Sequence, residues 1–399
     1  MRFAERMSLI KPSPSSMAGQ RVRELRESGR DVIGLTAGEP DFDTPENIQE
    51  AAIRAIREGQ TKYTDVGGMP TLKLAVIEKF RRENGLEYKQ NEIIVSSGAK
   101  QVIFNALMCL VQEGDEVIIP VPYWVSYPDM VRFAGGTPVF IECPKSNRFK
   151  LLPERLEEAI TPRTRCLLLN SPNNPSGASY TEAELKALAA VLLRHPGVFI
   201  ITDDIYEHLL YDGNQFATIA SVEAGLKDRV LTVNGVSKAY AMTGWRIGYA
   251  GGNAPLISNM VKLQSQSTSC PSAISQAAAI EALTGPQDVI ASSRQVFQAR
   301  RDLLVERINQ IPGLSCIKPE GAFYVFVSYE ELMGRRTPQG QEIHGDVDFV
   351  LHLAEAQGIV VIPGSAYGMP GFFRVSIATS EKIILDGQKR IAQACAQLG

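Results

Sequence analysis

The sequence lacks the cysteine and apolar patterns that mark several classes of protein. Its six cysteines lie far apart, and no two of them form a CxxC pair. This spacing argues against a zinc site and against a disulfide framework, so we expect reduced cysteines and no bound metal. No apolar run approaches the roughly 18 residues of a membrane span, and the segment 1–10 is charged, without the apolar region of a signal peptide. We therefore expect a soluble, cytoplasmic protein with no membrane partner.

An excess of charge of one sign is also absent. The 399 residues include 41 Lys and Arg against 44 Asp and Glu, which gives a net charge of −3. No basic run suits nucleic acid or an anionic membrane, so an anionic ligand must be bound by individually placed cations. The chain is too long for one ordinary domain and long enough for a sizeable core, so we expect two domains that share an interface.

From about residue 72 the sequence alternates between short apolar runs and helical patterns. The apolar runs predict strands at 93–95, 116–119, 166–169, 198–201, 230–233 and 247–250. Continuous apolar runs are typical of strands buried on both faces, as in a parallel sheet wrapped by helices. Ligands of such sheets bind beyond the carboxyl ends of the strands. The residues after each strand are therefore the first candidates for a functional site.

The segments after these strands carry complementary chemistry. The segment 96–101 leads into a helix whose free amides suit an anion, and 122–127 carries aromatic rings that can stack on a flat ligand. Asn174 follows the third strand, and Asp203 and Tyr206 follow the fourth. Each feature alone is at least as common as a turn, a core aromatic or a helix cap. Together they predict one site at one edge of the sheet.

A lysine and an arginine complete this set. Lys238 comes just after the strand 230–233, and Arg246 just before the strand 247–250. A lysine that forms an imine with a carbonyl compound must first lose its proton, which burial and a nearby positive charge favour. Arg246 could supply that charge and also bind an anionic group of the same ligand. The alternative is a surface lysine next to an arginine that covers an apolar strand.

Five segments, in order, resemble the class I aminotransferases of pyridoxal-phosphate fold type I, most closely the bacterial aspartate aminotransferases. The segments are 35–42, 123–128, 171–175, 237–249 and 373–376, and 237–249 is the most specific. The resemblance covers nearly the whole chain. It implies an α/β fold, with a large domain built on a mostly parallel seven-stranded sheet wrapped by helices and a smaller α+β domain.

The expected domain organisation has three parts. Residues 1–45 would join the small domain, 46–290 would form the large cofactor-binding domain, and 291–399 would form the small C-terminal domain. We find no internal repeat that would suggest a different division.

The resemblance also implies how the cofactor, pyridoxal 5′-phosphate, is bound. Lys238 would bind it covalently and move a proton between substrate and cofactor, while Asp203 would pair with the pyridine nitrogen. Tyr206 and Asn174 would hydrogen-bond the 3-oxygen of the ring, and Trp124 would stack on it. The residues implied around the phosphate are Gly98, Ala99, Lys100, Ser237, Arg246 and, from a partner subunit, Tyr63.

The substrate-binding positions that the resemblance implies are Gly38, Trp124, Asn174, Arg374, Lys100, Ser13 and Ser15. Arg374 would bind the α-carboxylate, and Lys100 with the serines would meet the distal carboxylate of a dicarboxylic amino acid. The implied reaction converts L-aspartate and 2-oxoglutarate to oxaloacetate and L-glutamate, in a ping-pong cycle through pyridoxamine phosphate. The implied assembly is a homodimer with shared active sites, and its partners are small amino acids and 2-oxo acids.

Three positions depart from the family pattern. Gly235 stands where many relatives have a serine for the phosphate, Ser176 replaces a common threonine, and Asp204 replaces a common glutamate. Ser237 would take over the phosphate contact.

Other functions stay open at this stage. The nearest alternative is an aminotransferase for prephenate, aromatic or other neutral amino acids, in which Lys100 serves only the phosphate. A carbon–sulfur lyase of the same fold would need no keto-acid acceptor, and a regulatory protein would bind the coenzyme without turnover.

Overall fold

The computed structural model describes residues 1–399, except for the side chain of Ser15. The implied contact of Ser15 with a distal carboxylate therefore lies outside the described residues. The largest sheet has seven strands in the order β2-β8-β7-β6-β5-β3-β4. Their bounds are β2 (Ile93–Ser96), β3 (Glu116–Val121), β4 (Thr137–Glu142), β5 (Thr164–Asn170), β6 (Phe199–Asp203), β7 (Val230–Gly235) and β8 (Gly248–Gly251). β8 pairs antiparallel with β2 and β7, and the pairs β7-β6-β5-β3-β4 are parallel.

The six strands that the apolar runs predict are all present in this sheet. β4, the seventh, is an edge strand whose apolar run, 139–141, is short and directly follows Pro138. Only one of its side chains, Ile141, is buried, and Pro138 has no backbone N–H to donate to a neighbouring strand. The mostly parallel sheet that the family resemblance implies is confirmed.

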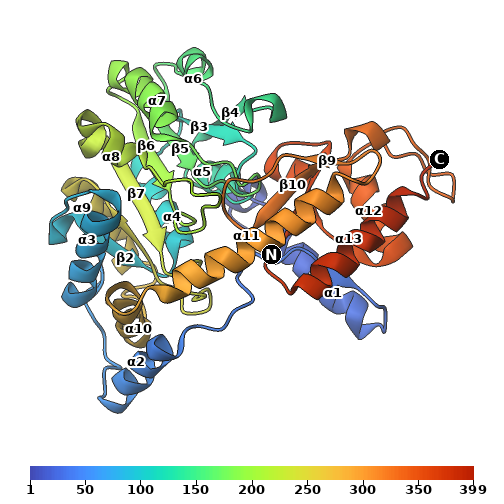
Figure 1. The fold of residues 1–399 in the computed structure, drawn as a ribbon. Coiled ribbons are helices and arrows are strands. Elements are labelled where there is room, and N and C mark those ends of the chain that lie inside the picture. The colour runs from blue at the N-terminus through green and yellow to red at the C-terminus, as the bar shows by residue number, and fades with distance from the viewer.

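Helices cover both faces of this sheet (Figure 1). One face packs against α4 (Ala99–Leu110), α5 (Tyr127–Phe133) and α9 (Ala254–Ser265). The other face and its rim are covered by α2 (Glu46–Arg57), α3 (Pro70–Asn84), α6 (Pro153–Ala159), α7 (Glu182–Arg194), α8 (Ile219–Val222) and α10 (Ala273–Thr284). With apolar layers on both sides, the polar ends of the strands are left as the place for a ligand.

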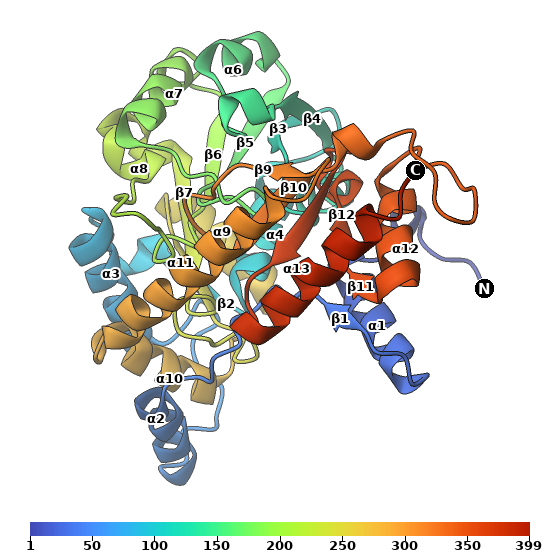
Figure 2. The same cartoon turned by 45° about the vertical axis from the view of Figure 1, so that its right-hand side comes forward.

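The rest of the chain forms a smaller body beside the large sheet (Figure 2). It holds a four-stranded antiparallel sheet, β12-β13-β10-β9, and a parallel pair, β1-β11. The strands are β1 (Ile33–Gly34), β9 (Ser315–Cys316), β10 (Tyr324–Ser328), β11 (Ile359–Val360), β12 (Ile362–Pro363) and β13 (Phe372–Ser376). The helices are α1 (Pro14–Glu27), α11 (Asp288–Ile308), α12 (Asp346–Gln357) and α13 (Glu381–Cys395).

The long helix α11 runs from the large body into the small one (Figure 1). Its buried residues Phe297, Leu304 and Ile308 belong to the apolar core of the small body. The pairing of β1 with β11 likewise ties the N-terminal segment to this body. Each of the six cysteines carries a free thiol. Within the described residues, no helix combines the length and the apolar character needed to span a bilayer.

Candidate active site

A cavity of about 390 Å³ lies where the carboxyl ends of the large sheet meet the small body. Its walls come from both bodies and from the N-terminal segment. The predicted site residues that line it are Ser13, Gly38, Ala99, Lys100, Trp124, Asn174, Asp203, Tyr206, Ser237, Lys238, Arg246 and Arg374. The structure thus brings together residues between positions 13 and 374 at the predicted edge of the large sheet.

Lys238 reaches into this cavity from the segment just after β7. Its ammonium group donates a hydrogen bond to the carbonyl oxygen of Gly38. Burial lowers the pKa of Lys238 to about 8; Glu39 opposes this shift, whereas Arg246 and Arg374 add to it. The amine is therefore far easier to deprotonate than an ordinary lysine, as a nucleophile requires.

Asp203 is the last residue of β6, and only one of its two carboxylate oxygens has a hydrogen-bond partner. Oδ2 accepts a hydrogen bond of 2.6 Å from the hydroxyl of Tyr127, and Oδ1 is buried without a partner. Burial raises the pKa of Asp203 to about 6, while the bond from Tyr127, the backbone amide of Ile205 and the charge of Lys238 act in the opposite direction. An orphaned buried oxygen of this kind calls for a donor that the protein does not supply.

An anion cradle forms at the first turn of α4. The amides of Ala99 and Lys100 lie in that turn, where no helical acceptor exists for them. Arg246 lies beside it, because its guanidinium donates to the carbonyl oxygens of Thr243 and Ser97, at 2.8 and 3.3 Å. The helix terminus and the guanidinium together suit a phosphate group.

Gly98 is required at this cradle for two reasons. Its φ of 93° belongs to the left-handed region, and a Cβ there would lie 2.3 Å from Nη2 of Arg246. Gly235, where a serine is common in the family, also lies in a tight space: a Cβ would be 3.0 Å from the carbonyl oxygen of Ile247. Gly235 does not line the cavity, whereas Ser237 does.

Arg374, on β13, is held for carboxylate binding. Nη1 donates to Oδ1 of Asn174 at 3.0 Å, and Nη2 donates to the carbonyl oxygen of Thr36 at 2.8 Å. Nε is buried and has no hydrogen-bond partner. A fixed guanidinium with an unused donor can bind a planar anion at one defined place.

A second cation, Lys100, lies beside the aromatic wall. Its ammonium nitrogen is 4.8 Å from the ring centroid of Trp124. Burial, and then the charge of Arg246, lower the pKa of Lys100. Ser13 lines the same cavity, and so does Ser16, which the sequence did not single out.

Two predicted cofactor contacts, Gly98 and Tyr63, do not line the cavity; Gly98 lies at the cradle, whereas Tyr63 lies elsewhere. It is 92% exposed, and the hollow that it lines is a different one, between α2 and α10. Within one chain, Tyr63 therefore contributes nothing to the cavity.

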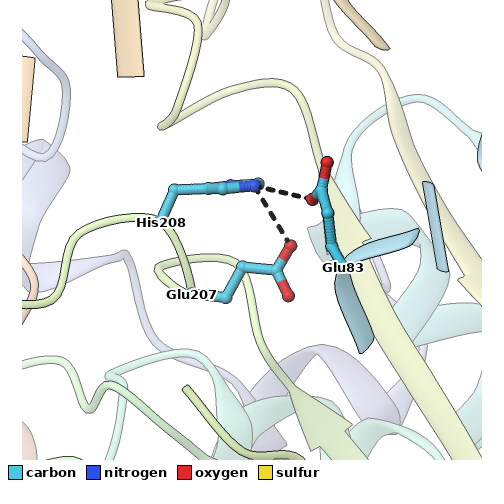
Figure 3. Close-up of side chains that lie close together, drawn as sticks. All are labelled: Glu83, Glu207 and His208. Atoms are coloured by element: carbon cyan, nitrogen blue, oxygen red, sulfur yellow. Dashed lines mark hydrogen bonds and ion pairs between the residues drawn. The ribbon is translucent and has the colours of Figure 1, made fainter. Parts of the chain in front are cut away.

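A partly exposed ion network fixes the turn that carries the site residues after β6. His208 contacts Glu83 at 2.8 Å and Glu207 at 3.5 Å (Figure 3). The fully buried ammonium of Lys79 contacts both carboxylates, so the cluster already contains its own positive charge. Because Glu83 and Lys79 come from α3, the network attaches the segment 204–209 to that helix.

Three contacts escaped the sequence analysis. Tyr127 lies in the aromatic segment after β3, and nothing in that pattern indicates its bond to Asp203. Tyr324 begins β10, and its hydroxyl lies 2.9 Å from that of Tyr206. Glu39 accepts a hydrogen bond of 2.7 Å from Thr243 and lines the cavity. Only the three-dimensional arrangement identifies such pairs.

The residues present fit pyridoxal phosphate. The unpartnered Oδ1 of Asp203 suits a ring N–H, the open amides of α4 suit a phosphate, and Lys238 has the lowered pKa that covalent attachment needs. The side chain of Trp124 supplies an aromatic surface for a flat ring.

Comparisons with known proteins agree with this arrangement. The family model described as aminotransferase class I and II matches residues 30–386. An aspartate aminotransferase of Rhizobium meliloti is 55% identical over 99% of this chain and 96% of its own length. An aspartate/prephenate aminotransferase of Cereibacter sphaeroides is 53% identical over 99% of both chains.

Solved structures give the same result. The crystal structure of the aspartate aminotransferase from Rhizobium meliloti superposes with a TM-score of 0.98, at 54% identity over the whole of both chains. The aspartate aminotransferase from Thermus thermophilus with maleate superposes with a TM-score of 0.92, at 44% identity over 99% of this chain and 100% of that one. On these matches and on the site described above, the chain belongs to the class I and II aminotransferases.

Proposed function

We propose that this protein is an aspartate aminotransferase, which converts L-aspartate and 2-oxoglutarate to oxaloacetate and L-glutamate with pyridoxal 5′-phosphate as its cofactor. The observation that carries this substrate assignment is a pair of separate cations around one activated lysine. Arg374 is anchored by Asn174, and Lys100 lies against Trp124, while both line the same cavity as Lys238. Two cations at different places match the two carboxylates of a dicarboxylic substrate.

The bound cofactor supplies an electron-withdrawing ring that stabilises negative charge at the substrate Cα. The protein must position that Cα and move its proton. Arg374 holds the α-carboxylate, and Lys238, when neutral, accepts the proton from Cα. Asp203 would pair with the ring nitrogen of the bound cofactor through its free Oδ1 and would keep that nitrogen protonated. These roles follow from position and charge, which is how the protein contributes to such chemistry.

The proposal is tested by measuring product from purified protein supplied with pyridoxal phosphate, L-aspartate and 2-oxoglutarate. We expect oxaloacetate and L-glutamate in equal amounts. When either substrate is omitted, we expect no continued formation of product. Release of ammonia from an amino acid without any acceptor would instead identify a lyase. Coenzyme binding without conversion of any amino acid would identify a binding protein.

A second amino acceptor, prephenate, is favoured by the relatives. The Cereibacter sphaeroides relative at 53% identity is named for both aspartate and prephenate. We propose that the same site accepts prephenate in place of 2-oxoglutarate. The test supplies prephenate with L-glutamate as donor; formation of 2-oxoglutarate at a rate above that without prephenate supports dual use, and its absence restricts the enzyme to the first reaction.

We also propose a cytoplasmic homodimer with shared active sites. The support is the position of Tyr63, which the family resemblance places at the cofactor phosphate although it lies outside the cavity of its own chain. A second copy of the chain could bring its Tyr63 to this cavity.

A further inference from the structure

Tyr324 links the two ends of the active site. It is 1% exposed, begins β10 in the small body, and lines the cavity. Its hydroxyl lies 2.9 Å from that of Tyr206, which belongs to the large body. Tyr324 therefore connects the small body to Tyr206, a residue expected to contact the cofactor.

The ring of Tyr324 also carries the substrate-binding arginine. The guanidinium carbon of Arg374 is 4.1 Å from the ring centroid, a close cation–π distance. Backbone pairing fixes this arrangement, because Tyr324 is opposite Ser376 and Phe326 is opposite Arg374 in the β10-β13 ladder. Arg374 is therefore held by the ring of Tyr324 as well as by its hydrogen bonds.

Only one of the two hydroxyl hydrogens of Tyr206 and Tyr324 is used in the hydrogen bond between them, so the other is free to be donated elsewhere. Each phenol can donate one hydrogen bond, and only one of the two hydroxyls donates across the 2.9 Å contact. If Tyr206 donates to the 3-oxygen of the cofactor, Tyr324 must be the donor to Tyr206. Burial raises the pKa of both phenols, so both stay protonated as this chain of donors requires.

We propose that Tyr324 is a positioning residue that serves both ends of the reaction site: its hydroxyl orients the Tyr206 hydroxyl toward the cofactor 3-oxygen, and its ring orients Arg374 toward the substrate carboxylate. This inference rests on the proposed function of the site. It predicts that the two contributions can be separated, because one depends on the oxygen atom and the other on the ring.

Two substitutions separate them. Tyr324→Phe removes the hydroxyl and keeps the ring, whereas Tyr324→Leu removes both. Tyr329→Phe is the matched control, since Tyr329 is equally buried in the same body, its hydroxyl has no hydrogen-bond partner, and its ring stacks on Phe349 away from the cavity.

The first readout is the pH midpoint of the visible absorbance band of the bound coenzyme. A donor to the 3-oxygen holds negative charge on that atom and so weakens its hold on the neighbouring proton. We expect Tyr324→Phe to raise the midpoint by about half a unit to one unit, which is the equivalent of one ordinary hydrogen bond. Tyr329→Phe should leave the midpoint unchanged.

The second readout is the dissociation constant of maleate, a dicarboxylate that cannot react, measured through the same band. We expect Tyr324→Phe to bind maleate within about twofold of the parent protein, and Tyr324→Leu to bind it about threefold to tenfold more weakly. An unchanged midpoint in Tyr324→Phe, or equal loss of maleate binding in both variants, would overturn the proposal. A parent protein that shows no coenzyme band would instead contradict the proposed function itself.

Discussion

At the scale of single residues, the lowered pKa of Lys238 governs how the protein takes up its cofactor. Only the neutral amine attacks a carbonyl group, so the rate of uptake by cofactor-free protein should rise with pH and level off above a midpoint near 8. Arg246→Gln should move this midpoint upward, because the charge of Arg246 favours the neutral amine. The measurement is stopped-flow absorbance across a pH series.

A midpoint close to the ordinary lysine value of 10.5 would show that the amine is not perturbed in the folded protein. Lys238→Ala is the control, since it should bind the coenzyme only non-covalently. Its transamination rate should fall by at least about 10² to 10⁴-fold, the usual contribution of a positioned acid or base.

Lys100 offers a second prediction at this scale. Lys100→Ala should lower kcat/KM for L-aspartate by about 10-fold to 100-fold, as expected for the loss of a charged hydrogen bond, and should change L-alanine much less. Steady-state kinetics at saturating coenzyme give both values. Lys227→Ala is the matched control, because Lys227 also lies over an aromatic ring, that of Tyr88, outside the cavity.

Equal losses for both amino acids would assign Lys100 to the phosphate alone. Such a result would also shift the substrate assignment toward neutral donors, since Lys100 is the cation proposed for the distal carboxylate.

At the scale of elements, the start of α4 is shaped for an anion. Gly98 and Gly114 have nearly the same φ, 93° and 92°, but only at Gly98 does a Cβ meet another group, the guanidinium of Arg246. Alanine at either position should cost about 1–2 kcal/mol of stability. Only Gly98→Ala should displace Arg246, and it should weaken coenzyme binding about tenfold.

Thermal unfolding of the cofactor-free proteins and equilibrium titration with pyridoxal phosphate measure the two effects. If Gly114→Ala weakened coenzyme binding as much as Gly98→Ala, the loss would reflect general destabilisation rather than the cradle.

The sequence alone predicts most strands of the large sheet and several site residues at the strand ends. Apolar runs predicted the central strands, and the rule for parallel sheets placed Asp203 and Lys238 at one edge, as the cavity confirms. The edge strand β4 was not predicted individually, because its apolar run 139–141 is short and follows Pro138, which weakens the signal for a strand. The short apolar run 359–362 divides between β11 and β12, which belong to two different sheets, and nothing in its sequence marks the division.

Partners across the two bodies could not be predicted. The bond from Tyr127 to Asp203 spans 76 positions, and the pair of Tyr206 and Tyr324 spans 118. No local periodicity encodes pairs so far apart in the sequence. Lys238 was predicted from its place after a strand, whereas the role of Arg374 was predicted only from the family resemblance. Tyr63 was found in the same way, and its role stays a prediction.

At the scale of the whole molecule, a shared active site can be tested by complementation. In a mixed dimer of Lys238→Ala and Tyr63→Ala chains, one cavity would contain both an intact Lys238 and an intact Tyr63 from the other chain. Mixing the two inactive or weakened proteins under exchanging conditions should therefore raise activity above the mean of the separate samples.

Light scattering should give about twice the chain mass of 43.7 kDa. A monomer with full activity, or mixtures without any gain, would contradict the shared site. The domain boundaries 1–45, 46–290 and 291–399 likewise stay predictions, which limited proteolysis can examine.

The central claim is that Lys238 and its cavity transaminate aspartate, and the most direct measurement is an absorbance spectrum of the purified protein with bound coenzyme. Addition of L-aspartate alone should remove the visible band and produce an absorbance at shorter wavelength, and subsequent 2-oxoglutarate should restore the first band. If L-aspartate leaves the band unchanged while an aromatic or neutral amino acid removes it, the fold and the cofactor stand and the assignment to aspartate is contradicted.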